Sequence, residues 1–201
     1  MREPFIYLAS GSPRRRELLA QLGVSFEVLV TDIDESLRPG EPADAYVRRM
    51  ATDKARAALG LMPARRAPVL GADTTVVVDR HILGKPTDRE AAAGMLRRLS
   101  GGDHEVLTAV AVVDGEADGL SDRGRAAVAV SRTIVTFRAL DDTEIDAYWA
   151  TGEPRDKAGG YAIQGLGAVF IEAIHGSYSG VMGLPLFETA YLLNGLGYRF
   201  M

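Results

Sequence analysis

Short apolar runs alternate along the chain with longer segments in which apolar side chains recur every three or four residues. The apolar runs predict β-strands and the longer periodicity predicts amphipathic helices. We expect strands over residues 5–8, 26–30, 69–78, 82–83, 105–113, 126–137 and 168–174. We expect helices over residues 13–23, 43–59, 88–99, 141–150 and 185–196. Helices and strands mix throughout, which predicts an α/β fold with a mixed sheet.

The segments between these elements are polar or rich in glycine. Residues 31–42 form a polar loop, and residues 114–125 form a Gly/Asp-rich loop that predicts a hairpin between its two flanking strands. Residues 151–167 are expected to be a Gly-rich loop with some extended backbone. We find no internal repeat and no linker, so we expect a single domain over residues 1–201, with two lobes around a cleft.

The start of the helix expected at residue 13 carries several signals of an anion site. Ser12 can act as the N-cap, Pro13 suits the first helical position, and three arginines follow. Free backbone N–H groups and the positive end of the helix dipole would meet guanidinium groups there, which favours a phosphate chain as ligand. The alternative is a capped surface helix with solvated arginines.

Two cations lie on apolar helical faces. Lys54 falls seven residues after Val47 on the apolar stripe of the helix 43–59, and must snorkel, pair with an acid or face a cleft. Arg15 aligns with three leucines at offsets of three, four and seven, so its head is expected along the inner face of the helix start.

Asp73 lies within the apolar run 69–78, which predicts a central strand buried on both faces. An unpaired carboxylate in such a strand is costly, so Asp73 needs a cation, a metal or strong hydrogen-bond donors. We favour catalysis or metal binding over a carboxylate that caps a nearby turn.

Lys85 and Gln164 are further candidates for ligand binding. Lys85 follows Gly84 on a corner from which it could reach a phosphate, although Pro86 rules out a Walker P-loop. Gln164 lies in the Gly-rich segment and offers both a donor and an acceptor to a base edge. The alternatives are a solvated turn lysine and a flexible connection.

Composition narrows the function classes. The 201 residues carry a net charge of −4, which argues against a binder of nucleic-acid polymers. There is no cysteine, so disulfides, a thiol nucleophile and cysteine-ligated metals are excluded. The three histidines have no metal-ligand spacing, and Tyr178 stands where a nucleophile elbow needs serine. The N-terminal apolar run is too short for a signal peptide and no run suits a membrane span, so we expect a soluble cytoplasmic protein.

Seven ordered segments resemble the Maf family of septum-formation-type nucleoside triphosphate pyrophosphatases. They begin with Leu-Ala-Ser-Gly-Ser-Pro-Arg-Arg at 8–15, Lys-Ala at 54–55, Gly-Ala-Asp-Thr at 71–74 and Gly-Lys-Pro at 84–86. They continue with Leu-Ser-Gly at 99–101, Asp-Lys-Ala-Gly-Gly-Tyr-Ala-Ile-Gln-Gly at 156–165, and the stretch from Gly-Ser-Tyr at 176–178 to Gly-Leu-Pro at 183–185.

The resemblance implies hydrolysis of a nucleoside triphosphate to a monophosphate and pyrophosphate with a divalent metal, Mg²⁺ or Mn²⁺. It implies an elongated mixed sheet flanked by helices with a central cleft, similar to inosine triphosphate pyrophosphatases, and a homodimer. Asp73 matches the family's proposed proton acceptor. The positions that match the phosphate and metal site are Ser10, Arg15, Glu35, Lys54 and Lys85, with Glu35 and Asp73 expected on the metal.

Within the family the chain resembles the dTTP/UTP branch. Arg14, Thr74 and Gln164 match the positions associated with substrate choice. The 7-methyl-GTP branch typically has a bulky aromatic residue in place of Arg14 and an acidic residue in place of Thr74. Modified pyrimidine triphosphates are further candidate substrates. The alternatives are a 7-methyl-GTP pyrophosphatase and a nucleotide-binding regulator of cell division that acts through a partner.

Overall fold

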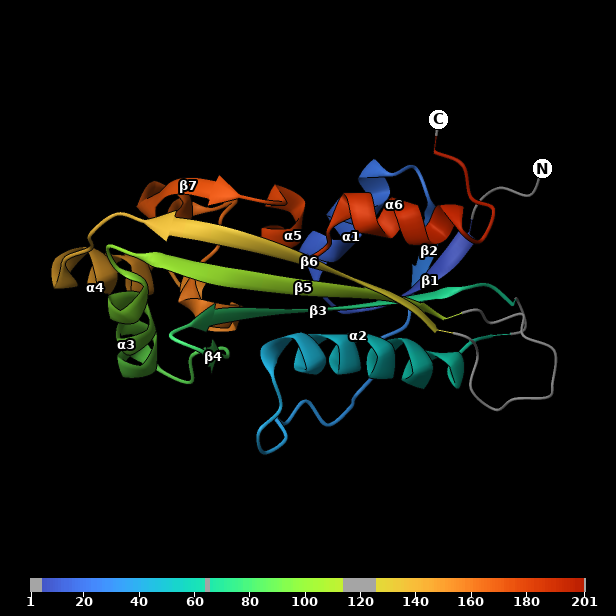
Figure 1. Cartoon of the computed structure of the whole chain (residues 1–201), viewed down its shortest axis with the longest axis horizontal. Helices are drawn as coiled ribbons and strands as arrows, with labels where there is room; N and C mark the ends of the chain where they lie inside the picture. Colours follow the sequence, from blue (N-terminus) through green and yellow to red (C-terminus); the bar gives the residue numbers. More distant parts are fainter. Residues whose placement is uncertain (1–4, 64–65, 114–125, 201) are drawn as a thin grey trace. The chain divides into compact units, whose positions relative to one another are not determined.

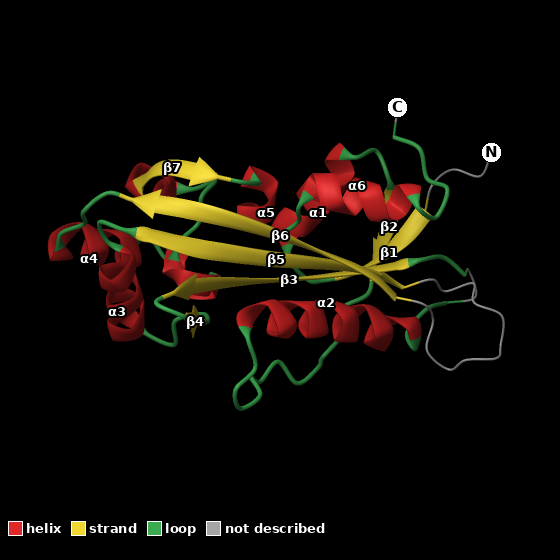
Figure 2. Cartoon of the chain, in the orientation of Figure 1, coloured by secondary structure: helices red, strands yellow, loops and turns green. Residues whose placement is uncertain are grey.

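The computed structural model describes residues 5–63, 66–113 and 126–200, and its centre is a mixed seven-stranded sheet. The strand order is β2-β1-β3-β5-β6-β7, and β4 pairs with β3 outside this path. The strands are β1 (Phe5–Ala9), β2 (Ser25–Val28), β3 (Val69–Val78), β4 (His81–Leu83), β5 (Asp103–Val113), β6 (Ala126–Phe137) and β7 (Ile171–His175). Figure 2 shows these strands in yellow with red helices beside them. The prediction of a mixed sheet flanked by helices is confirmed.

The pairing follows from the length of each connection. β1 is parallel to both β2 and β3, and each of these strands is reached through a helix, as parallel neighbours require. β3 and β4 are antiparallel and are joined by Asp79 and Arg80, whose φ angles of 49° and 64° give the twist that suits a two-residue hairpin. β6 and β7 are also antiparallel.

The described residues form six α-helices, some of which begin with a side-chain cap. They are α1 (Pro13–Gln21), α2 (Ala43–Leu59), α3 (Arg89–Leu99), α4 (Asp142–Ala150), α5 (Tyr178–Met182) and α6 (Leu186–Asn194). The Asp88 carboxylate accepts from the Ala91 amide at 2.8 Å at the start of α3. Asp141 and Glu144 form a capping box at the start of α4. No helix of the described residues is both long and apolar enough for a bilayer crossing.

The predictions were least accurate after residue 150. This region contains three short 3₁₀-helices, η1 (Glu153–Asp156), η2 (Ala158–Gly160) and η3 (Leu166–Phe170), and Lys157 and Tyr161 between them have the extended backbone that was expected. The strand predicted from residue 168 therefore begins only at Ile171, and α5 was not predicted. Closely spaced glycines remove the periodicity on which the prediction rested. The loop predicted at 114–125 lies outside the described residues.

Backbone contacts divide the chain into two compact units, which we describe separately. Unit 1 comprises Met1–Asp73, Thr108–Ser131 and Gly183–Met201. In Figure 1 α2 runs beside the unit 1 part of β3, with α1 and α6 drawn on the other side of that strand. One apolar cluster of unit 1 joins β1 and β3 to α2; its buried members are Phe5, Tyr7, Ala9, Ala55, Ala58, Ala67, Val69 and Val113.

Unit 2 comprises Thr74–Leu107 and Arg132–Met182. Its helices α3 and α4 lie side by side, joined by the ion pairs Arg97–Asp142 at 2.7 Å and Arg89–Asp146 at 2.5 Å. Its core combines aliphatic side chains with an aromatic group, in which His104, Phe137 and Tyr161 make edge-on ring contacts. The Tyr161 hydroxyl lies 2.8 Å from Nε2 of His104.

Candidate active site

A buried ion pair joins α2 to β3 in unit 1. Lys54 Nζ lies 2.7 Å from Asp73 Oδ1, and the side chains are only 12% and 10% exposed. The two elements approach closely at Gly71, where a Cβ would lie 2.2 Å from the Ala51 carbonyl oxygen. Of the three kinds of partner expected for Asp73, which were a cation, a metal or strong donors, the structure shows a cation, and of the three expectations for Lys54 it shows the pairing with an acid.

A second carboxylate reaches the same ammonium group. Glu35 Oε1 lies 2.9 Å from Lys54 Nζ, and the Glu35 side chain is 50% exposed. Its neighbour Asp34 instead accepts a hydrogen bond from the Ser36 amide at 2.9 Å, which forms a local turn. The polar loop thus presents Glu35 to Lys54, so two carboxylate oxygens lie around one nitrogen.

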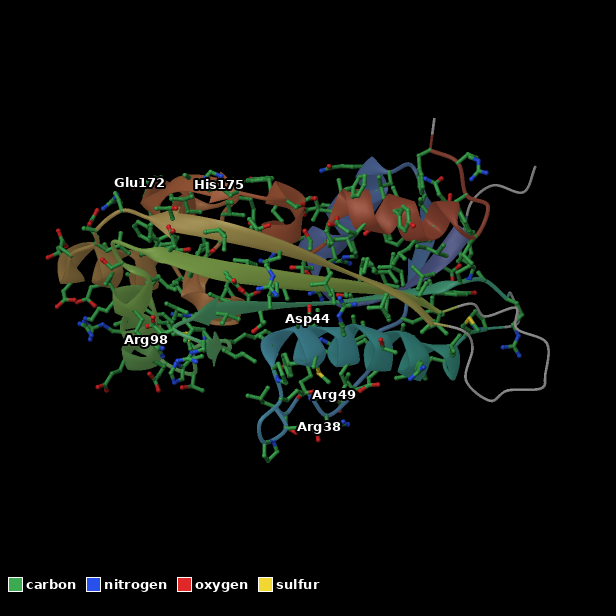
Figure 3. All side chains as sticks on the ribbon, viewed as in Figure 1. Arg38, Asp44, Arg49, Arg98, Glu172 and His175 are labelled. Carbon is green, nitrogen blue, oxygen red and sulfur yellow. The ribbon has the colours of Figure 1, made fainter. Side chains whose placement is uncertain are left out.

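The loop that carries Glu35 is held to α2 by a group of contacts that we call the α2 clamp, made by Tyr46, Arg49 and Glu41. Arg49 contacts the Glu41 carboxylate through Nε and Nη2, both at 2.6 Å. Arg49 also donates to the Ser36 carbonyl at 3.0 Å, and the Tyr46 hydroxyl donates to the Glu35 carbonyl at 3.0 Å. Figure 3 shows Arg49 of α2 and Arg38 of the loop lying together below that helix. The clamp fixes the backbone on which Glu35 stands.

Neighbouring charges shift the pKa values of two members of the α2 clamp, Glu41 and Tyr46. The hydrogen bond from Arg49 lowers the pKa of Glu41 to about 2. Burial, followed by the negative charges of Asp73 and Glu35, raises the pKa of Tyr46 to about 12. The clamp was not predicted, because Arg49 and Glu41 are eight residues apart, a spacing that no helical pair produces.

Arg15 and Ser10 form the third part of the unit 1 site. Arg15 Nε donates to the Gly183 carbonyl at 2.8 Å, and its Nη1 donates to Ser10 Oγ at 3.2 Å. Burial lowers the pKa of Arg15, while the charges of Asp73 and Glu35 oppose this shift. Unit 1 thus brings together five of the predicted site residues: Ser10, Arg15, Glu35, Lys54 and Asp73.

The start of α1 differs from the prediction in one detail. Ser12 occupies the N-cap position and Pro13 is the first helical residue, as predicted, but the Ser12 side chain makes no capping hydrogen bond. Its amide donates instead to Ser10 Oγ at 3.3 Å. The first turn of α1 therefore has no side-chain cap, and Arg14, beside it, is half-buried.

The other three predicted residues belong to unit 2. Thr74 is half-buried in β3 and, since side chains alternate along a strand, it is directed to the opposite face from Asp73. Lys85 and Gln164 are both exposed. The Gly84 carbonyl accepts from the Gly159 amide at 3.0 Å, which attaches the Lys85 corner to the segment that leads to Gln164.

The donor set fits a hard divalent cation that keeps other ligands. Glu35 and Asp73 lie close together, since each places one carboxylate oxygen within 2.9 Å of the same Lys54 nitrogen. The residues that the structure describes contain no group of three or more His, Cys, Asp and Glu side chains suited to a metal. Mg²⁺ is commonly held by one or two carboxylates together with substrate phosphates, and this arrangement suits that kind of site.

Comparison with known proteins identifies the family. The sequence profile of the Maf-like proteins matches residues 5–196. The chain belongs to the Maf-like family. Relatives named dTTP/UTP pyrophosphatase include those of Aromatoleum aromaticum (53% identical, 96% of each chain covered) and Alkalilimnicola ehrlichii (54%, with 95% of this chain and 92% of the relative covered). A third, from Escherichia coli O157:H7, is 53% identical, with 94% of this chain and 91% of the relative covered.

The sequence identity between this Maf-like chain and proteins of solved structure is lower than its identity with these relatives. A nucleoside-triphosphatase, a dITP/XTP pyrophosphatase from Mycobacterium abscessus, is 17% identical with a TM-score of 0.42, over 66% of this chain and 74% of that one.

Proposed function

We propose that this Maf-like protein hydrolyses dTTP and UTP to the nucleoside monophosphate and pyrophosphate. The observation that carries the proposal is the buried Lys54–Asp73 pair, with Glu35 and Arg15 beside it. A buried acid among cations provides a base next to a place where phosphate charge can be neutralised. The relatives' name, at 53–54% identity over nearly the whole chain, supports this substrate class.

In the proposed reaction Asp73 acts on a water molecule. Its carboxylate orients the water and accepts one proton while the water oxygen attacks the α-phosphorus. The bond between the α-phosphorus and the bridging oxygen breaks, and pyrophosphate leaves with the electron pair. The position of Asp73 is fixed by Lys54, which contacts its Oδ1 at 2.7 Å.

The cations and the helix start would bind the triphosphate. Arg15, Lys54 and Lys85 neutralise phosphate charge, which increases on the leaving group in the transition state. Ser10 and the first turn of α1 hold a phosphate, because that turn has no side-chain cap. Arg15 is already oriented by its bonds to Gly183 and Ser10, so little ordering is left for the moment of binding.

Glu35 and Asp73 would hold the divalent metal, Mg²⁺ or Mn²⁺, together with phosphate oxygens. Such an ion lowers the pKa of a bound water and polarises phosphoryl oxygens. The chain's part is to keep the two carboxylates in place, through Lys54 for Asp73 and through the α2 clamp for Glu35.

Arg14, Thr74 and Gln164 are proposed to select the pyrimidine base, and modified pyrimidine triphosphates are candidate substrates too. The cytoplasmic location, expected from the sequence, and the homodimer, implied by the family resemblance, stay predictions, and a regulator of cell division stays the alternative.

The test is pyrophosphate release by the purified protein with Mg²⁺ or Mn²⁺. The panel contains dTTP, UTP, CTP, dCTP, ATP, GTP and 7-methyl-GTP, with Asp73→Asn alongside. We expect turnover of dTTP and UTP, and at least an approximately hundredfold loss in the variant. Asp34→Asn is the matched control, because Asp34 contacts its own loop and makes no ion pair with Lys54.

The other outcomes separate the alternatives. Preference for 7-methyl-GTP would overturn the proposed base selection while keeping the reaction. Tight nucleotide binding without any turnover would favour a regulator, and wild-type turnover in Asp73→Asn would remove Asp73 as the base.

A further inference from the structure

A tyrosine and a glutamate of unit 2 hold the segment that carries Gln164. Tyr148 lies near the end of α4 and is only 4% exposed. Its hydroxyl donates to Glu153 Oε1 at 2.6 Å and accepts from the Ala162 amide at 3.1 Å. One hydroxyl group therefore binds both the glutamate and the backbone two residues before Gln164.

Glu153 binds the same segment on its other side. Its Oε2 accepts from the Leu166 amide and its Oε1 from the Gly167 amide, both at 3.0 Å. Burial acts to raise the pKa of Glu153, but the hydrogen bonds from Tyr148, Gly167 and Leu166 outweigh it, so the pKa is lowered. The carboxylate therefore stays ionised at neutral pH and forms charge-assisted hydrogen bonds.

Two glycines let the segment come this close. A Cβ at Gly165 would lie 2.3 Å from Glu153 Oε2. A Cβ at Gly167 would lie 2.7 Å from the Tyr148 hydroxyl and 2.9 Å from the Ala162 carbonyl oxygen. A side chain at Gly167 would strike the Ala162 backbone, and a side chain at Gly165 would displace the Glu153 carboxylate from its place against the segment.

Gln164 is the exposed residue between these attachment points. Tyr161, Ala162 and Ile163 before it are buried, and Leu166 and Gly167 after it are held by Glu153. The backbone on both sides of Gln164 is thus fixed, while Gln164 itself is exposed. We propose that Tyr148 and Glu153 are positioning residues that set Gln164 for substrate choice, an inference that rests on the proposed function.

The physical reason is pre-organisation. A side-chain amide discriminates between base edges only if its donor and acceptor are held in one place before the substrate arrives. If the pair is lost, Gln164 must be ordered during binding, which weakens binding of the preferred substrate most. The expected signature is a raised KM for the pyrimidine substrate, with kcat changed much less.

The test compares kcat and KM for UTP and GTP in Tyr148→Phe and Glu153→Gln. Tyr148→Phe removes only the hydroxyl. It keeps the ring, which packs edge-on against Phe170 with 5.0 Å between the ring centroids. We expect the ratio of kcat/KM for UTP over GTP to fall roughly tenfold, mainly through the KM for UTP. Glu144→Gln is the matched control. It neutralises a carboxylate on α4, the helix of Tyr148, and that carboxylate accepts hydrogen bonds from the Arg138 side chain and the Asp141 amide instead of from the Gln164 segment.

A second readout is independent of activity. We expect the Leu166 and Gly167 amides to exchange hydrogen faster in Glu153→Gln than in the wild type, and to be unaffected in Glu144→Gln. Unchanged exchange at both amides would overturn the proposed attachment.

A double-mutant cycle with Gln164→Ala separates positioning from general damage. In the Gln164→Ala background, Tyr148→Phe should reduce the UTP/GTP ratio no further. If Gln164→Ala lowers the ratio but Tyr148→Phe and Glu153→Gln leave it unchanged, the positioning role is wrong. If Gln164→Ala itself leaves the ratio unchanged, the assignment of Gln164 under the proposed function is wrong instead.

Discussion

Two segments carry proposed ligand residues, and different contacts hold them in place. The Glu35 loop in unit 1 is held by charge, through the contacts of Arg49 with Glu41 at 2.6 Å. The Gln164 segment in unit 2 is held by a buried hydroxyl and one carboxylate that accepts from backbone amides. The first arrangement fixes a charged group and the second fixes a neutral amide.

The same difference runs through the interiors of the two units. Unit 1 buries the charged pair Lys54 and Asp73, and each charge compensates the other. Unit 2 buries His104, whose Nε2 lies 2.8 Å from the Tyr161 hydroxyl and whose Nδ1 is buried without a hydrogen-bond partner among the described residues. The stability of unit 1 is therefore expected to fall when Lys54 or Asp73 loses its partner. The stability of unit 2 is expected to fall when His104 gains a positive charge.

The largest effect is expected from Lys54→Met. This change leaves Asp73 buried without the cation that contacts it, which should lower the free energy of unfolding by about 4 kcal/mol. Urea unfolding at neutral pH measures the loss. The control is the double variant Lys54→Met with Asp73→Asn, which should recover part of the stability because residue 73 no longer buries a charge. An undiminished midpoint in Lys54→Met would show that the pair contributes nothing to folding.

The next effect is acid destabilisation of unit 2 through His104. Burial lowers the pKa of His104 to about 4, below its ordinary value of 6.5. The unfolded chain therefore binds a proton at a pH where the folded chain does not, so stability falls as the pH drops from about 6.5 to about 4. The total loss is up to about 3 kcal/mol, from the size of the shift.

Urea unfolding at several pH values, with His104→Gln, tests this expectation. The variant should have a flatter stability profile between pH 6.5 and 4 than the wild type. His81→Gln, which changes an exposed histidine, is the control. The same slope in the wild type and in His104→Gln would rule out His104 as the source.

A smaller effect is expected at the contact between β3 and α2. A Cβ in Gly71→Ala would lie 2.2 Å from the Ala51 carbonyl oxygen and 2.8 Å from the Ala55 amide nitrogen, and these are backbone atoms. The helix must shift, at a cost of about 2 kcal/mol. Gly94→Ala is the matched control, because a Cβ there meets nothing within 4 Å and the change should stabilise α3. Thermal unfolding of both variants measures the difference, and equal midpoints would contradict the close approach.

The smallest effect is expected at the α2 clamp. Arg49→Lys removes the two-pronged contact with Glu41, so the 36–41 loop should open more often while global unfolding changes little. Hydrogen exchange at the Arg38 amide, which donates to Glu41 at 3.1 Å, should become several-fold faster. Arg48→Lys, which changes an exposed pair with Asp44 on the same helix, should leave this amide unaffected. Equal exchange in both variants would mean that Arg49 does not hold the loop.

Acid should affect the two units at different pH values. The contribution of Glu41 is present above its ordinary pKa of 4.5 and is lost as the pH falls through about 2. The His104 effect is complete by about pH 4. The α2 clamp should therefore still be formed at a pH where unit 2 is already destabilised, which exchange at the Arg38 amide between pH 5 and 3 can check.

The sequence predicted those parts of the molecule whose local pattern has one physical solution. The strand over 69–78 and the helix over 43–59 were predicted with their observed bounds, because each has a strong apolar pattern. Lys54 and Asp73 were identified because a charge on an apolar face needs a partner. The family resemblance placed Glu35 in the same site, whereas the pairing of Lys54 with Asp73 and the contact of Glu35 with Lys54 came only from the structure.

The sequence by itself determined the order of the elements, the family and the residue types available for phosphate chemistry. The tertiary structure decided the partners: Arg49 with Glu41, Tyr148 with Glu153, and His104 with Tyr161. Those residues are 8, 5 and 57 positions apart, separations that leave no periodic signal. Helix and strand periods record which face of an element is apolar, whereas a hydrogen bond between elements depends on how their backbones pack, and that is fixed only when the whole chain folds.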